Sequence, residues 1–168
     1  MKALQGIRIL DLTHMLSGPY MGMMLADLGA ESIKVEPPVT GEGTRRLLEK
    51  DPKNSLNGFG AYYMTLNRNK KSITLDLKSE KGLEVFYELV KTADIVLSNF
   101  SAGVTARLKV DYEHLSKINP RIITCTVTGF GETGPNKDRT AFDMVAQAMG
   151  GGMSITGQPD NPPTRSGI

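Results

Sequence analysis

Apolar and polar positions along the chain follow two periods, the two-residue period of strands and the 3.6-residue period of helices. β-Branched and apolar runs predict five strands, at residues 7–13, 32–36, 72–77, 94–100 and 121–127. Helical spacing predicts helices at residues 19–28, 80–92, in the segment that carries Arg107, at 112–118 and after Phe142. Because strands alternate with helices, we expect an α/β fold with an open, mostly parallel sheet flanked by helices.

Several residues mark the predicted ends of these elements. Pro19 suits the first position of a helix, and Gly29 suits the position just after its end. Ser79 is expected to cap the helix at 80–92, and Asp111 the helix at 112–118. Residues 39–60 are rich in Gly, Asn and charge, so they predict a long loop with one helical turn near residues 45–50.

Composition limits the classes of function. The 168 residues suffice for one domain with a real core, and a net charge of +2 with no run of like charge gives no sign of nucleic-acid binding. We see neither a signal peptide nor 18 consecutive apolar residues, so we expect a cytoplasmic protein without a membrane segment. Cys125 is expected to pack in a strand. With only His14 and His114 besides, no metal-ligand spacing occurs, and we expect no metal.

The stretch from residue 121 to 152 runs from a strand into a Gly-rich loop and then a short helix. Gly129 to Gly134 spell G-x-G-x-x-G, the dinucleotide fingerprint, but no apolar periodicity follows until Phe142. The first strand-to-helix turn also lacks a glycine fingerprint, so we expect no nicotinamide cofactor. Two interpretations stay open: a ligand-facing loop with cations from Lys137 and Arg139, or a solvated connection.

Candidate chemistry emerges by elimination. Asp11, Asp27 and Asp76 are expected to be structural, and Asp143 suits the start of a helix. His14 ends a strand and is a candidate for the ligand side. The remaining strand-end cations and amides are Lys70, Lys71, Lys78, Asn99, Arg107, Lys137 and Arg139. Such groups suit a ligand that carries phosphate.

Four segments resemble the N-terminal part of the class III coenzyme A transferases, the CaiB/BaiF family that includes formyl-CoA and carnitine-CoA transferases. They are GIRILDLTHMLSGPYMGMMLADLGAESIKVEPP (6–38), LNRNKKSITLDLK (66–78), ADIVLSNFSAGVTARL (93–108), and NPRIITCTVTGFGETGP with AFDMVAQAMGG (119–151). The resemblance implies a Rossmann-like CoA-binding domain, here residues 1–150, within a longer chain that forms an interlocked homodimer.

The resemblance also assigns candidate site residues. Leu75, Lys78, Asn99, Phe100 and Arg107 match positions that line the CoA site in the family, while His14 and Met15 match the loop beside the thioester. Lys78 and Arg107 would serve the phosphates, and Leu75 and Phe100 would contact adenine or pantetheine. With Lys137 and Arg139 from the Gly-rich loop, these nine residues are the predicted CoA-binding set.

The substrates implied by the resemblance are an acyl-CoA donor and a carboxylic acid acceptor. The family nucleophile is an aspartate that attacks the thioester and passes through an enzyme-bound aspartyl-CoA thioester. That aspartate follows a segment similar to residues 163–167, so residues 151–168 would lead toward it. We expect the sequence to stop short of it at Ile168, to contain no catalytic residue and to be inactive alone.

Departures from the family pattern bear on the subtype. Leu16 stands where formyl-CoA transferases have glutamine and Pro37 where they have arginine, which weakens that specificity. Ser101-Ala102 replaces the commoner Arg-Pro. The racemase branch has a histidine–aspartate pair where this chain has Phe142-Asp143. An acyl-CoA:carboxylate CoA-transferase is therefore favoured, with a 2-methylacyl-CoA racemase and a non-catalytic CoA-binding fragment as alternatives.

Overall fold

The computed structural model describes residues 2–167 and divides the chain into two compact units. The first unit ends at Val127 and the second begins at Thr128. The first contains the whole five-stranded sheet and its covering helices, and the second contains the Gly-rich loop and the chain that follows it.

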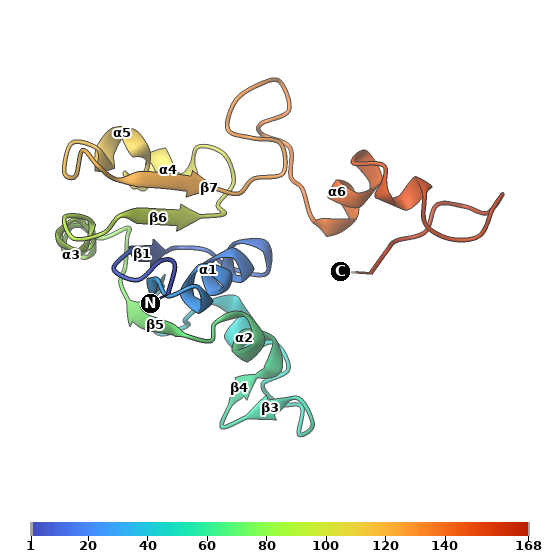
Figure 1. The fold of residues 1–168 in the computed structure, drawn as a ribbon, viewed down its shortest axis with the longest axis horizontal. Coiled ribbons are helices and arrows are strands. Elements are labelled where there is room, and N and C mark those ends of the chain that lie inside the picture. The colour runs from blue at the N-terminus through green and yellow to red at the C-terminus, as the bar shows by residue number, and fades with distance from the viewer. Residues whose placement is uncertain (1, 168) are drawn as a thin grey trace. The chain divides into compact units, whose positions relative to one another are not determined.

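The sheet of the first unit is parallel throughout its described pairings. Its strands are β1 (Arg8–Asp11), β2 (Glu31–Glu36), β5 (Lys70–Thr74), β6 (Ile95–Ser98) and β7 (Ile123–Thr126). They lie in the order β5-β2-β1-β6-β7 (Figure 1). Counted along the chain this is 3-2-1-4-5, the order of a doubly wound sheet whose direction reverses at the first strand. The predicted α/β fold is confirmed.

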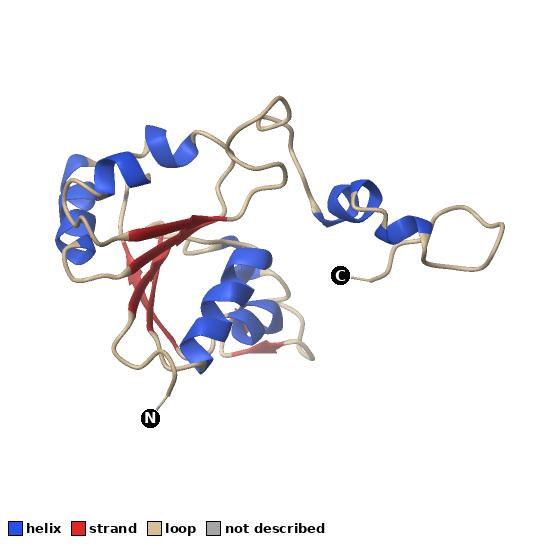
Figure 2. Ribbon diagram, turned by 45° about the horizontal axis from the view of Figure 1, so that its top comes forward, coloured by secondary structure: helices blue, strands red, loops and turns tan. Residues whose placement is uncertain are grey.

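Helices cover both faces of this sheet (Figure 2). One face carries α3 (Glu80–Val90), α4 (Val104–Arg107) and α5 (Tyr112–Leu115). The other face carries α1 (Ser17–Asp27), the 3₁₀ turn η1 (Gly43–Arg46) and α2 (Ala61–Leu66). A small antiparallel hairpin, β3 (Ser55–Leu56) with β4 (Phe59–Gly60), lies in the connection between η1 and α2.

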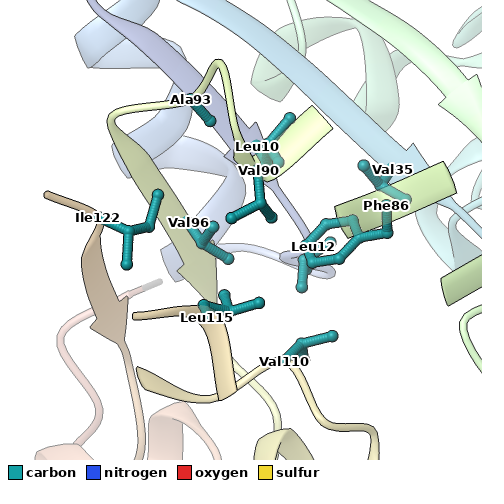
Figure 3. Close-up of a cluster of buried hydrophobic side chains, with 10 residues drawn as sticks. All are labelled: Leu10, Leu12, Val35, Phe86, Val90, Ala93, Val96, Val110, Leu115 and Ile122. Carbon is teal, nitrogen blue, oxygen red and sulfur yellow. The ribbon is translucent and has the colours of Figure 1, made fainter. Parts of the chain in front are cut away.

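The main hydrophobic core fills the face covered by α3, which we call the α3 face. Phe86 and Val90 of α3 are completely buried there against Leu10 and Val96 of the sheet (Figure 3). The cluster is completed by Leu12, Val35, Ala93, Val110, Leu115 and Ile122. The predicted apolar face of this helix is confirmed, since Leu83 and Tyr87 also pack on the cluster.

The opposite face, which we call the α1 face, is apolar only near the middle of the sheet. Ile9 and Leu97 are buried there, and Cys125 packs beside them as predicted. Toward β2 and β5 the buried side chains become polar or charged, and Asp11 and Lys34 are examples. Unlike the α3 face, this side of the sheet buries a layer of hydrogen-bonded polar groups.

The predicted element ends are confirmed in part. The Ser79 hydroxyl accepts the Gly82 N–H at 3.1 Å, and Gly29 has φ of +109° directly after the first helix. Asp111 does precede α5, but its carboxylate pairs with His114 and caps no backbone amide. The strand predicted at 72–77 begins earlier, at Lys70, because residues 70–74 pair with β2. The hairpin within the predicted 39–60 loop was not anticipated.

The second unit holds α6 (Asp143–Met149) and the 3₁₀ turn η2 (Gly152–Ser154). No helix opens at Gly134, and residues 131–140 are exposed. A dinucleotide loop would need a helix at that glycine, so the structure agrees with the rejection of the fingerprint.

Within residues 2–167 no helix has the length and apolar character needed to cross a membrane. The same residues contain no cluster of three or more His, Cys, Asp or Glu side chains placed to hold a metal ion.

Candidate functional site

A cavity of about 310 Å³ opens at the carboxyl end of the sheet in the first unit. Residues that directly follow β1, β2, β5 and β6 contribute to its wall. It is lined by Leu12, Thr13, His14, Val35, Glu36, Pro37, Gly41, Glu42, Gly43, Leu75, Asp76, Leu77, Lys78, Phe100 and Leu108. This volume is at the lower end of the range for ligand sites, so the cavity can hold part of a large ligand.

The position of this cavity follows from the strand order. The chain connects β1 to β2 in one direction across the sheet, whereas β6 lies on the other side of β1. The loops after β1 and β6 therefore diverge and leave a crevice, and in open α/β sheets ligands bind at that point. His14 follows β1 and Phe100 follows β6, and their ring centroids lie 5.4 Å apart.

The cavity wall is mostly apolar, with a neutral imidazole on one side. Leu75, Leu77 and Phe100 provide apolar surface, while the Lys78 side chain is exposed at the rim. Burial lowers the pKa of His14, Lys34 lowers it further, and the Glu42 carboxylate opposes both effects. His14 is therefore uncharged at neutral pH and can donate or accept one hydrogen bond toward a ligand.

The loop after β1 is held by side chains from three other segments. The Lys34 ammonium donates to the Thr13 carbonyl at 2.7 Å. The Asn99 side chain accepts the His14 N–H at 2.9 Å and donates to the His14 carbonyl at 2.6 Å. The Glu42 carboxylate accepts the Met15 N–H at 2.9 Å. Every peptide group from Thr13 to the Met15 N–H is thereby fixed in place.

The cavity wall also contains a charged carboxylate, that of Glu36, the last residue of β2. The Arg45 guanidinium donates two hydrogen bonds of 2.6 Å to the Glu36 carboxylate, and Ser72 donates a third, also of 2.6 Å. Arg45 also lies over the Tyr63 ring, 4.0 Å from its centroid. Burial alone would raise the pKa of Glu36, but the hydrogen bonds from Arg45 and Ser72 outweigh it and lower the pKa to about 2. Glu36 is therefore ionised at every ordinary pH.

Lys70 and Lys71 were candidate ligand cations at a strand end, and that prediction is wrong. Both lie at the amino end of β5, away from the cavity. The buried Lys70 ammonium donates to Asp11 at 2.8 Å, to the Pro19 carbonyl and to Asn67. Lys71 pairs with Glu31 at 2.6 Å. Their charges are already neutralised within the protein. The structural role expected for Asp11 is confirmed.

The structure brings together four of the nine predicted site residues: His14, Leu75, Lys78 and Phe100 all line the cavity. Met15 and Asn99 are next to lining residues in the sequence, and the Asn99 amide is engaged by the His14 backbone. That these residues bind CoA stays a prediction.

The other three predicted residues are exposed. Arg107 ends α4 directly before the lining residue Leu108, and within residues 2–167 its guanidinium forms no salt bridge. Lys137 and Arg139 belong to the second unit, where the Arg139 guanidinium lies 5.3 Å from the Phe130 ring centroid. Their part in a CoA site likewise stays a prediction.

Sequence reasoning missed Glu36 and Glu42 as cavity residues. Glu42 is only 4% exposed, although it comes from a stretch that looks like a polar surface loop. Its neighbours Gly41 and Gly43 were the available signal, because paired glycines permit a tight turn that directs the residue between them inward.

Comparison with known proteins gives a single family. Residues 4–168 match the sequence profile of CoA-transferase family III. A succinate–glutarate CoA-transferase of Agrobacterium fabrum is 44% identical over 98% of this chain, and a formyl-CoA:oxalate CoA-transferase of Streptomyces avermitilis is 46% identical over 99%. The crystal structure of a CaiB/BaiF family protein from Brucella suis superimposes on 99% of the chain with a TM-score of 0.91 and 42% identity.

The match covers only part of these relatives. The chain spans 42% of the length of the Agrobacterium protein, 39% of the Streptomyces protein and 44% of the Brucella chain. In the sequence alignments this chain is covered almost completely and the relatives are not.

Proposed function

The chain belongs to CoA-transferase family III, and we propose that it is the CoA-binding portion of an acyl-CoA:carboxylate CoA-transferase. The observation that carries the proposal is the cavity at the carboxyl end of the sheet. Its wall contains His14, Leu75, Lys78 and Phe100, four residues that the family resemblance assigns to CoA.

The chemistry of the cavity suits one end of a CoA thioester. Apolar walls at Leu75 and Phe100 match the adenine ring or the pantetheine arm. The exposed cations Lys78 and Arg107 match the phosphates. That Lys137 and Arg139 bind CoA phosphates is also part of the proposal.

In this proposal the residues of the cavity bind and orient the thioester. The covalent step is attack of an aspartate carboxylate on the thioester, which releases CoA and leaves a mixed anhydride. CoA then attacks the aspartyl carbonyl of the anhydride, which releases the donor acid as a carboxylate and leaves an aspartyl-CoA thioester. The acceptor carboxylate attacks this thioester and displaces CoA, and attack of CoA on the acceptor carbonyl of the new anhydride gives the product thioester and the free aspartate. A homodimer and a cytoplasmic location are carried as part of the proposal.

The relatives differ in their substrates, so the donor and the acceptor are left general. The names of these relatives include glutarate and oxalate as carboxylates at similar identity. The two enzymes named above are CoA-transferases, which favours the transferase over the racemase alternative. In the second unit Phe142 precedes α6 and carries no group that moves a proton.

Titration calorimetry with CoA tests the proposal. The Arg107→Ala variant is expected to weaken binding about tenfold, close to 1.4 kcal/mol, because a phosphate loses its guanidinium partner. Arg121→Ala is the matched control, since Arg121 is an exposed arginine just before the amino end of β7, at the opposite end of the sheet. Equal affinities for wild type and Arg107→Ala would contradict the assignment of Arg107. An absence of binding at millimolar CoA would contradict the preformed site.

A further inference from the structure

Glu42 is a buried carboxylate without a cationic partner. It is 4% exposed, and within residues 2–167 it forms no salt bridge. Its oxygens instead accept the Met15 N–H at 2.9 Å, the Thr44 N–H at 3.2 Å and the Thr44 hydroxyl. A buried charge is costly unless hydrogen bonds compensate it, so this arrangement calls for a reason.

The Met15 backbone is the unusual partner in this set. Met15 has φ of +65°, in the left-handed region that residues with a Cβ rarely adopt. Its side chain is 49% exposed, so burial of the side chain does not account for the conformation. The one hydrogen bond from its N–H goes to Glu42, 27 residues further along the chain.

The same loop carries His14, which lines the cavity. Asn99 accepts the His14 N–H on the amino side of His14 and donates to the His14 carbonyl on its carboxyl side, and Glu42 accepts the N–H of that second peptide, at Met15. The backbone is therefore fixed on both sides of the residue that carries the imidazole. Strain of this kind persists where surrounding contacts enforce it, and it gathers at ligand sites.

We propose that Glu42 is a positioning residue of the cavity: by accepting the Met15 N–H, its carboxylate holds Met15 left-handed and fixes His14 toward the bound thioester. The proposal rests on the function proposed above. It adds that the rim of the site is preorganised from the η1 connection, which the sequence predicted only as a long loop with one helical turn. Preorganisation of this kind raises affinity because less ordering remains to be done on binding.

A purely structural role for Glu42 makes a different prediction. Glu42 also precedes η1 and caps it through Thr44, so its loss could merely loosen that turn. Thr44→Val is the matched control, because it removes the Thr44 hydroxyl from the same carboxylate and leaves the Met15 hydrogen bond in place. Thr44 is completely buried, and valine has nearly its shape.

The test measures two quantities on this chain: CoA affinity by calorimetry and exchange of the Met15 amide hydrogen by NMR. For Glu42→Ala we expect Met15 exchange to accelerate and CoA affinity to fall, each by about tenfold. Thr44→Val is expected to leave both near wild type, and Glu42→Gln, which keeps an acceptor oxygen, is expected to lose less than Glu42→Ala. The effect of Glu42→Ala on affinity should shrink in a Met15→Gly background, since glycine adopts positive φ without strain.

The outcomes separate this proposal from the function itself. Unchanged Met15 exchange in folded Glu42→Ala overturns the positioning role, whatever CoA does. Faster Met15 exchange with unchanged CoA affinity also overturns the positioning role, because the hydrogen bond from Met15 to Glu42 would then have no influence on CoA binding. If wild type binds no CoA, the proposed function fails, and the exchange data alone decide whether Glu42 fixes the loop.

Discussion

The two faces of the parallel sheet are built from the same strands but stabilised differently. On the α3 face, Leu10 and Val96 pack against Phe86 in an apolar cluster. On the α1 face, the neighbouring residue Asp11 pairs with Lys70, and both side chains are at most 1% exposed. Since side chains alternate along a strand, adjacent residues of β1 experience the two environments.

The difference shows that the two faces contribute differently to stability and to the geometry of the site. The apolar face is non-directional and tolerates shape-conserving exchange, so it supports stability. The polar face is made of directional bonds that fix geometry. The cavity at the carboxyl end of the sheet takes its lining from both faces, with Glu36 and Glu42 from the polar layer and Leu12, Val35 and Phe100 from the α3 face. Gly22 lets α1 approach this layer, because a Cβ there would lie 2.7 Å from the Asp11 carboxylate.

The largest expected effect comes from breaking the buried ion pair on the α1 face. Lys70→Met leaves the Asp11 carboxylate buried without its cation, and we expect a loss of about 4 kcal/mol in the free energy of unfolding. Adding Asp11→Asn removes the unpaired buried charge but keeps an acceptor for the Thr13 N–H. The double variant should therefore recover at least half of the lost free energy of unfolding. Urea denaturation measures both. A double variant as unstable as the single would show that charge is not the cause.

A somewhat smaller effect is expected on the α3 face of the same strand. Leu10→Ala should cost about 3 kcal/mol through lost burial and the cavity left behind. Because no titratable group is involved, the loss should be the same at pH 3 and pH 7, which denaturation at the two pH values measures. A loss that changed with pH would mean that the two faces are coupled through β1.

The smallest expected effect is the acid sensitivity of the α1 face. The pKa of Glu36 is about 2 in the fold against an ordinary value of 4.5, so its contribution is complete above pH 4.5 and is lost as pH falls toward 2. Between pH 5 and pH 3 the fold should lose about 2 kcal/mol from this group. Glu36→Gln should flatten that part of the stability curve. An unchanged slope would contradict the role of the Arg45 hydrogen bonds.

Much of the fold followed from local pattern. The five strands and the helices α1, α3, α4 and α5 were predicted because periodicity and caps such as Ser79 are properties of neighbouring residues. The fold class followed from their alternation. The small hairpin around residue 57 was missed because its strands are only two residues long and carry no alternation.

The site was less predictable. His14 and Lys78 were found because each follows a predicted strand, and in a parallel sheet those ends meet at one edge. Glu42 was missed because it belongs to no regular element. Lys70 was misjudged because the predicted strand began two residues late, at residue 72. The prediction therefore placed Lys70 in a turn, whereas in the structure Lys70 is the first residue of β5.

The sequence by itself determined the elements, their parallel arrangement and, through resemblance, the family. Only the tertiary structure decided which polar groups meet. Asn99 reaches the His14 backbone across 85 residues, and Lys70 reaches Asp11 across 59. Such pairs are set by the order of strands in the sheet and by the depth of each loop, and neither quantity is encoded in the spacing of neighbouring residues.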